Sequence, residues 1–337
     1  MMKIVHLTSH IGHGGDWTVI RTLSELFQEK GHQVVIGGCR AASTQFNSVE
    51  MPLNQGLKGF LQSLLKINAL PSDANIAHVH TPISLLLALS FRHLRCPSLK
   101  IIFTYHWQTP DSQLKKQIKA LLFKLPDIVH SSSSEIHEAL AQEYKVNKTK
   151  NHLAYFGANP DRFCIRSLTE KKKLRENYAI ADDAFVLLFV GRLSPEKNIS
   201  LILRYLHRNP PEEMILLLAG EGPIQENLQQ ECQDLGIEKR VHFLGRRENM
   251  EEIYSLANLL VLPSSSLETF GMVVIEAAFC GVPTLRSNLP GAKDQINHGE
   301  DGFIFPIQQP EKMFEVLDSI WNQRDDLPKI GQKARDR

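Results

Sequence analysis

Residues 184–222 have the sequence AFVLLFVGRLSPEKNISLILRYLHRNPPEEMILLLAGEG, and this stretch decides the fold class. An apolar run over 184–191 is followed by a polar turn, an amphipathic stretch that starts near Asn198, and a second apolar run over 214–222. Short apolar runs that alternate with helical patterns are typical of a parallel sheet covered by helices on both faces. We therefore predict a β–α–β unit here.

The same alternation extends outward in both directions. The segment from Trp17 to Lys30 has apolar residues at the three-to-four spacing of a helix face. Further strands are predicted at 3–9, 33–38, 76–80, 100–106, 127–133, 151–157, 241–245, 259–265, 283–287 and 302–306. The chain is thus expected to be an α/β protein with parallel sheets.

One polar segment, 159–183, interrupts the alternation and contains no strand pattern. Domain boundaries fall in such segments, so we place the boundary near residue 165. The predicted domains span 1–165 and 166–320. A helical segment over 321–337 follows, and it could return to the first domain.

The composition is that of a soluble globular protein. Hydrophobic residues make up 42% of the 337 residues and charged residues 22%. The five cysteines lack CxxC spacing, which is typical of reduced thiols in a cytosolic protein. The start of the chain lacks the apolar core of a signal peptide, and no apolar run approaches the roughly 18–20 residues of a membrane span. We expect a cytoplasmic protein.

The charge is unevenly distributed along the chain. Residues 1–165 carry 17 basic and 11 acidic side chains, whereas the remainder has an excess of acids. Within the basic half, the segments 57–67 and 112–125 combine leucine-rich stripes with lysines. Each could be a helix that lies on an anionic membrane, or an ordinary helix with its stripe in the core. Nucleic acid is not expected as a partner, because the cations are not interleaved with aromatic residues.

The first motif that carries chemistry is GRLSPEKN at 191–198, which directly follows a predicted strand. Ligands of open parallel sheets bind at the carboxyl ends of the strands. Arg192 and Lys197 could neutralise a diphosphate there, as a leaving group with growing negative charge requires. Taken alone, the motif is equally compatible with a surface turn that carries two solvated cations.

The second motif is ETFGMVVIE at 268–276, which follows the predicted strand 259–265. It places Glu268 in a loop and Glu276 on a helix that starts near Gly271. A glycine allows close approach of a ligand to the backbone, and a helix N-terminus offers free amides to hydroxyls or phosphate. Taken alone, the acids could also be a helix-terminal glutamate and an exposed one.

Together and in this order, the two motifs resemble the retaining glycosyltransferases of family 4. Members of that family have the GT-B architecture, in which the parallel sheets of two Rossmann-like domains face each other across a cleft. The resemblance spans nearly the whole chain and is supported by HGG (13–15), AHVHTP (77–82), FTYH (103–106), GANPDRF (157–163), AGEGP (219–223) and VHFLG (241–245).

The resemblance implies a role for particular residues. Arg192 and Lys197 would bind the donor diphosphate, with Gly14 and Gly15 approaching it from the acceptor-binding first domain. Glu276 would hold the ribose, and Glu268 would contact the donor sugar near the reacting centre. The remaining implied contacts are His106 near the acceptor, Phe270, Gly271 and Met272 at the donor sugar, and Leu244, Gly245 and Arg246 at the base.

Two departures from the family pattern concern other positions. Asp16 and Trp17 stand where the family often has Ala-Glu, and Asp294 stands in place of a glutamate in the loop 290–302. Donor contacts near Asp16 could therefore differ from those of the family.

We expect no metal and no cofactor, because Arg192 and Lys197 supply positive charge and no Asp-x-Asp pattern occurs. His6, His10 and His13 lie near the first loop, but such histidines are more often structural or on the surface.

The expected function is transfer of a sugar, with retained configuration, from a nucleotide-sugar to a glycan or lipid-linked acceptor. Family frequency favours a UDP-sugar, and bacterial surface polysaccharide or lipopolysaccharide synthesis at the inner face of the membrane is the expected setting. Three alternatives stay open at this point. One is a nucleotide-sugar epimerase of the same architecture, and another is a non-catalytic partner of an active transferase. The third is a sugar phosphorylase, which would need orthophosphate or a lysine that binds pyridoxal phosphate, and the sequence gives no clear signal of such a lysine.

Overall fold

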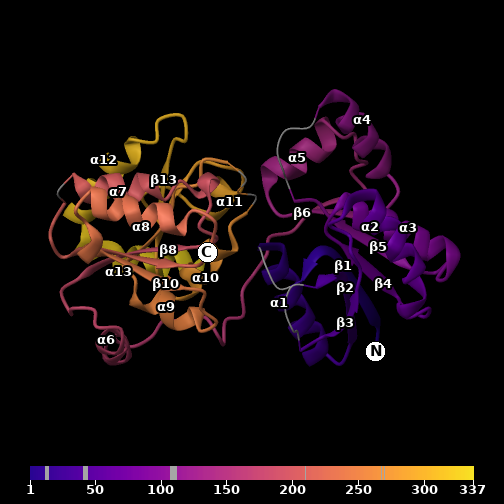
Figure 1. Cartoon of the computed structure of the whole chain (residues 1–337), viewed down its shortest axis with the longest axis horizontal. Coiled ribbons are helices and arrows are strands. Elements are labelled where there is room, and N and C mark those ends of the chain that lie inside the picture. Colours follow the sequence, from indigo (N-terminus) through magenta and orange to yellow (C-terminus); the bar gives the residue numbers. More distant parts are fainter. Residues whose placement is uncertain (12–14, 41–44, 107–111, 209, 267, 269) are drawn as a thin grey trace. The chain divides into compact units, whose positions relative to one another are not determined.

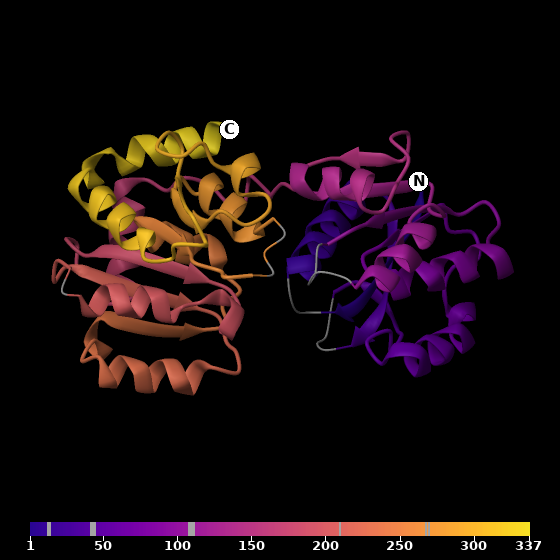
Figure 2. The ribbon, with the colours of Figure 1, turned by 90° about the horizontal axis from the view of Figure 1, so that it is seen from above.

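The computed structural model describes the whole chain except residues 12–14, 41–44, 107–111, 209, 267 and 269. The described residues form two compact units, Met1–Phe156 and Gly157–Arg337. Each unit is a parallel sheet flanked by helices (Figures 1 and 2).

The described part of the first unit contains a seven-stranded sheet of order β3-β2-β1-β4-β5-β6-β7, in which every pairing is parallel. Its strands are β1 (Lys3–Ile11), β2 (Gln33–Arg40), β3 (Asn47–Glu50), β4 (Ile76–Val79), β5 (Lys100–Thr104), β6 (Ile128–Ser131) and β7 (Asn151–Leu153). Its helices are α1 (Gly15–Glu29), α2 (Gly56–Leu65), the short η1 (Ile67–Ala69), α3 (Pro82–Leu94), α4 (Gln113–Leu122) and α5 (Ser134–Gln142).

Successive residues of a strand point to opposite faces of the sheet, and this separates two environments in the first unit. Val5, Leu7, Ala77 and Val79 pack with α2 and α3 in one apolar cluster. The alternate positions of β1 and β4 are His6 and His78, which lie on the other face. There Phe27 of α1 stacks on His6, with 6.2 Å between ring centroids.

The described part of the second unit contains a six-stranded parallel sheet of order β10-β9-β8-β11-β12-β13. Its strands are β8 (Phe185–Val190), β9 (Met214–Ala219), β10 (Val241–Gly245), β11 (Leu259–Leu262), β12 (Thr284–Ser287) and β13 (Phe303–Phe305). Its helices are α6 (Leu168–Asn177), α7 (Ser200–His207), α8 (Gln225–Asp234), α9 (Met250–Leu256), α10 (Met272–Phe279), α11 (Ala292–Gln295), α12 (Lys312–Asn322) and α13 (Leu327–Asp336), with the short η2 (Pro195–Lys197), η3 (Glu238–Arg240) and η4 (Arg324–Asp326).

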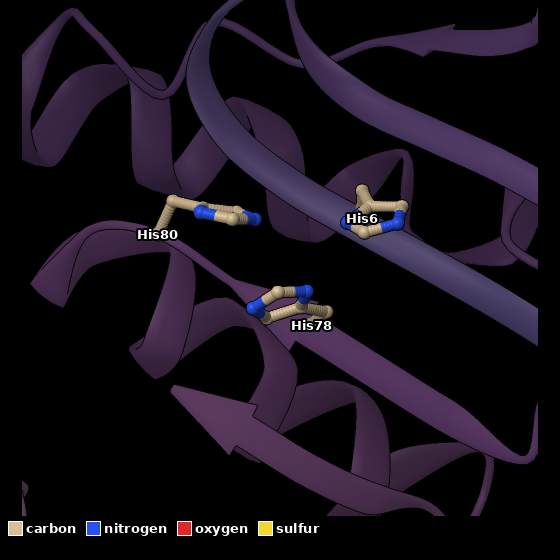
Figure 3. A group of neighbouring side chains, drawn as sticks. All are labelled: His6, His78 and His80. Atoms are coloured by element: carbon tan, nitrogen blue, oxygen red, sulfur yellow. The ribbon is translucent and has the colours of Figure 1, made fainter. Parts of the chain in front are cut away.

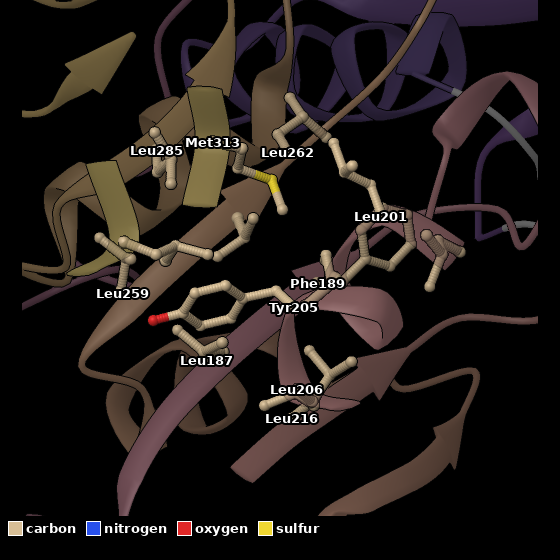
Figure 4. Close-up of a cluster of buried hydrophobic side chains, with 14 of the residues drawn as sticks. Leu187, Phe189, Leu201, Tyr205, Leu206, Leu216, Leu259, Leu262, Leu285 and Met313 are labelled. Atoms are coloured by element: carbon tan, nitrogen blue, oxygen red, sulfur yellow. The ribbon is translucent and has the colours of Figure 1, made fainter. Parts of the chain in front are cut away.

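The core of the second unit explains why residues 184–222 form a β–α–β unit. Leu187 and Phe189 of β8 point to one face, where they pack with Leu201 and Leu206 of α7 and with residues of α8 and α12 (Figure 4). The alternate residues Val186 and Leu188 pack on the opposite face with α9 and α10. Both faces of β8 are therefore apolar, as the continuous apolar run predicts.

The predicted α/β class is confirmed, and one strand was not expected. Strand β3 (Asn47–Glu50) was not predicted, because the sequence NSVE has no apolar run. Within the described residues it is an edge strand that pairs with β2 alone. The C-terminal segment belongs to the second unit, where α13 packs against α10. A return of this segment to the first domain stays a prediction.

None of the helices in the described part of the chain is long and apolar enough to cross a membrane.

Candidate functional site

The loop that follows β8 carries both predicted cations. Its backbone is fixed by Gly191, whose amide donates to the Ala219 carbonyl at 3.0 Å. The short η2 turn (Pro195–Lys197) then positions Lys197, whose side chain is 17% exposed. Arg192 is exposed, and with Lys197 it helps to lower the pKa of Glu196, which is lowered mainly by a hydrogen bond from Ser194.

Two glycines of the segment after β9 lie directly against this loop. A Cβ atom on Gly220 would come within 1.9 Å of the Gly191 carbonyl oxygen, and one on Gly222 within 2.1 Å of the Leu193 carbonyl oxygen. Real side chains do not approach a backbone oxygen so closely. The sequence AGEGP therefore allows the loops after β8 and β9 to pack backbone to backbone.

The loop after β11 is hydrogen-bonded to the loop after β8. The Ser265 amide donates to the Glu196 carbonyl at 2.8 Å. Lys197 Nζ lies 2.7 Å from Glu268 Oε2, and the Glu268 side chain is 12% exposed. The Ser264 hydroxyl is 3.5 Å from the same carboxylate oxygen. The structure thus joins one cation and one acid of the two motifs in a partly buried ion pair.

A buried arginine that sequence reasoning missed supports the start of α10. Arg286 on β12 is fully buried, and its guanidinium donates to the Phe270 carbonyl at 3.0 Å and to the Gln295 side chain. Gly271, the residue before α10, has φ +80°, a conformation that favours glycine. Arg286 of β12 thus holds the segment from Phe270 to Met272 in place. In the sequence, the signal for this role was a charged residue, Arg286, within the otherwise apolar strand pattern PTLRS (283–287).

Glu276 lies one turn into α10 and contacts Tyr254 of α9. It is 7% exposed, and the Tyr254 hydroxyl donates to its Oε2 at 2.6 Å. Burial, with the nearby Glu276 charge adding to it, raises the pKa of Tyr254 well above its usual value. The hydroxyl therefore keeps its proton and donates it to the Glu276 carboxylate.

The predicted base-binding residues lie at the end of β10, next to the same loops. Gly245 has φ +67°, and its carbonyl accepts a hydrogen bond from Gly220 at 2.9 Å. The Arg246 amide donates to the Glu221 side chain at 3.3 Å. Leu244 is partly buried. The segments after β8, β9 and β10 thus form one connected rim at the carboxyl edge of the second sheet.

In the first unit, Gly15 is the first residue of α1, and Gly14 lies outside the described residues.

His106 follows β5, and its Nε2 lies 3.3 Å from Nδ1 of His80. Burial lowers the pKa of His106 to about 4, although the charge of Asp16 acts in the opposite direction. His106 is therefore neutral near pH 7.

His80 belongs to a cluster of buried histidines in the first unit, with His6 and His78 (Figure 3). The sequence placed His6 beside His10 and His13 instead. His13 lies outside the described residues, and so does the side chain of His10.

Two family models match this chain, and together they cover nearly all of it. The model described as Glycosyltransferase Family 4 matches residues 13–162, and the model described as Glycosyl transferases group 1 matches residues 170–337. The chain is a member of glycosyltransferase family 4.

Curated relatives of this glycosyltransferase agree with that assignment. An uncharacterized glycosyltransferase of Methanocaldococcus jannaschii is 30% identical over 211 residues, which are 60% of this chain and 53% of the relative. The N-acetyl-alpha-D-glucosaminyl L-malate synthase of Bacillus anthracis is 25% identical over 278 residues, 78% of this chain and 70% of the relative. The chain therefore spans about half the length of the first of these relatives.

The fold is that of GT-B glycosyltransferases. The crystal structure of HepE from Anabaena in complex with UDP-glucose matches with a TM-score of 0.83 and 20% identity, over 99% of this chain and 94% of HepE. At this identity the likeness concerns the fold. It confirms that the glycosyltransferase consists of two Rossmann-like units, whereas the roles of individual residues stay predictions.

Proposed function

We propose that this glycosyltransferase transfers a sugar from a UDP-sugar, with retained configuration, to a glycan or lipid-linked acceptor in bacterial surface polysaccharide or lipopolysaccharide synthesis. The ion pair of Lys197 and Glu268 at 2.7 Å carries the proposal, because it joins the two motifs at the carboxyl edge of one sheet. The complex of HepE with UDP-glucose, in a protein of the same fold, supports the choice of donor.

In the proposed mechanism, Arg192, Lys197 and the first amides of α10 stabilise the departing diphosphate. Lys197 would exchange its contact with Glu268 for a phosphate oxygen, and Glu268 would accept from a hydroxyl of the donor sugar. The acceptor hydroxyl attacks from the face that the diphosphate leaves and passes its proton to a phosphate oxygen. Because the cations come from side chains, no metal ion is needed at the diphosphate.

Binding of the donor tests this proposal first. We expect UDP-sugars to raise the melting temperature of the whole chain more than GDP- or ADP-sugars do. At 100 times its Kd, a ligand adds about 2.7 kcal/mol to stability. The shift should not depend on added Mg²⁺ or Mn²⁺. If no nucleotide-sugar stabilises the chain, or if only metal-loaded donors do, the proposed donor site is wrong.

Incubation of the stabilising donor without acceptor separates the alternatives. A transferase should hydrolyse the donor slowly, whereas an epimerase of GT-B architecture would release the donor with an inverted sugar centre. A non-catalytic partner would do neither, and would leave product formation unchanged in cells that carry Glu268→Ala.

Helix α4 supports a lipid-linked acceptor. Most of its apolar stripe lies outside the core, since Leu114, Ile118 and Leu121 are 67%, 57% and 68% exposed, whereas Leu122 packs against the apolar cluster of the first unit. The helix thus packs on the core through one side and exposes most of the stripe. Lys115 and Lys124 are exposed beside it. An exposed apolar stripe flanked by cations is typical of helices that lie on anionic membranes.

We predict that the double variant Leu114→Gln/Leu121→Gln binds anionic vesicles about 100-fold more weakly than the unchanged chain, because burial of each leucine is worth about 1.5–3 kcal/mol. Vesicle sedimentation measures the effect. The matched control is Leu168→Gln on α6 in the second unit, where Leu168 is 87% exposed. Equal binding of both variants would show that α4 does not contact the membrane.

A further inference from the structure

Three histidines of the first unit meet on one face of the sheet. His6 on β1 is paired in register with His78 on β4, and His80 follows His78 by two residues, just after the end of β4. Each offers a ring nitrogen, and these atoms all lie within 4.8 Å of one another. Figure 3 shows the labelled rings grouped around a common point, with a nitrogen of His80 directed toward the other two.

Several of these nitrogens lack a hydrogen-bond partner. His6 is fully buried, and neither of its ring nitrogens bonds to any residue that the structure describes. Nε2 of His80, a residue only 3% exposed, also lacks a partner within the described chain. Buried polar atoms are nearly always satisfied, so unpartnered nitrogens that face one another indicate a missing ligand.

A chain of hydrogen bonds determines which nitrogen His78 presents. His130 donates from Nε2 to the Ala154 carbonyl at 2.8 Å, so its Nδ1 is the acceptor. Thr104 then donates to that Nδ1 at 3.0 Å. The Thr104 oxygen in turn accepts from Nε2 of His78 at 2.7 Å. A neutral His78 therefore carries its proton on Nε2 and keeps a lone pair on Nδ1.

We propose that His6, His78 and His80 bind a divalent transition metal ion, with Zn²⁺ as the best match to three imidazole ligands. Imidazole is a preferred ligand of zinc, and Zn–N bonds of about 2.0–2.1 Å place ligand nitrogens roughly 3.4 Å apart. The nitrogens lie within 4.8 Å of one another, so the rings would move closer together on binding the ion. Three ligands leave the fourth position of a tetrahedral zinc ion to another ligand.

The surroundings match those of known metal-binding histidines. Burial lowers the pKa of His6 to about 4 and holds those of His78 and His80 well below their usual value, so all three are in the neutral form that binds metal. Thr104 accepts from the outer nitrogen of His78, and His106 Nε2 lies 3.3 Å from the outer nitrogen of His80. Such outer partners orient the ligating rings.

This inference departs from the expectation that the chain holds no metal. The proposed ion lies in the first unit, and it is not assigned a role in holding the diphosphate.

Titration of the chelator-treated full chain with Zn²⁺ alone tests the proposal. We expect one ion per chain with a Kd below about 1 µM, and a Co²⁺-substituted form with visible ligand-field bands. His6→Gln and His80→Gln should each weaken binding by at least about 100-fold, and Thr104→Val by about 10–100-fold through loss of the outer partner. His242→Gln, which changes an exposed histidine of the second unit, should bind as the unchanged chain does.

X-ray absorption of the zinc-loaded unchanged chain keeps the test valid if the histidine variants do not fold. Three imidazole ligands per zinc support the site. Absence of stoichiometric binding, thiolate ligation, or binding that survives both histidine substitutions would overturn it. If the three histidines hold water instead of metal, the chain will bind no stoichiometric metal, and the proposal is overturned.

Discussion

The Lys197→Met variant should lose about two to three orders of magnitude in kcat, the usual cost of removing one preorganised group that stabilises developing charge. The methylene chain is kept, so packing changes little while the cation disappears. KM for the donor should change less than kcat, because the diphosphate gains charge as the bond to the sugar breaks. Steady-state kinetics with the UDP-sugar that stabilises the chain measures both values.

A purely structural role of the ion pair predicts a different pattern. Lys197→Met alone leaves the Glu268 carboxylate, 12% exposed, without its cation, so unfolding free energy should also fall. In the double variant Lys197→Met/Glu268→Leu no charge is left unpaired, and stability should recover. Activity should not recover if the two residues act on substrate. If kcat returns with stability, the pair is structural and the proposed mechanism is wrong.

The matched control is an exposed ion pair in the same unit. Lys329 lies 3.2 Å from Asp326, and its side chain is 81% exposed. Such pairs contribute about 0–1 kcal/mol. Lys329→Met should therefore leave kcat and the melting temperature near those of the unchanged chain.

The sequence predicted best the strands that carry continuous apolar runs, because such strands are buried on both faces of a sheet. A continuous apolar run such as that of β8 cannot be placed at a solvent-exposed edge, whereas the polar β3 forms only because β2 offers a free edge. Periodicity predicted one apolar stripe on α4, of which Leu114, Ile118 and Leu121 are exposed and Leu122 packs on the core. It could not say whether the stripe faces the core, because that depends on what the rest of the unit packs against.

The sequence predicted the two motifs of the candidate site, but not which of their residues lie in contact. Lys197 and Glu268 are 71 residues apart, and only the adjacency of β8 and β11 in the sheet brings their loops together. The histidine cluster depends on the register of β1 against β4, which pairs His6 with His78. Register across a crossover connection leaves no local signal in the sequence.

Replacing Gly222 with alanine should destabilise the second unit by about 3 kcal/mol, at the upper end of the range for overpacking. The new Cβ atom would lie 2.1 Å from the Leu193 carbonyl oxygen, and the contact involves backbone that no side-chain rotation can relieve. For a unit of this size, 3 kcal/mol corresponds to a melting temperature lower by about 6–12 °C. Calorimetry of the full chain measures this transition.

Gly157→Ala is the matched control, because a Cβ atom there has no other atom within 4 Å and neither glycine has a positive φ. Any general effect of replacing glycine is shared, so the difference between the variants isolates the contact with Leu193. Gly222→Ala should also weaken donor binding, since the displaced loop carries Arg192 and Lys197. If Gly222→Ala unfolds at the same temperature as Gly157→Ala, the loops after β8 and β9 do not pack as described, and the position assigned to both cations fails with them.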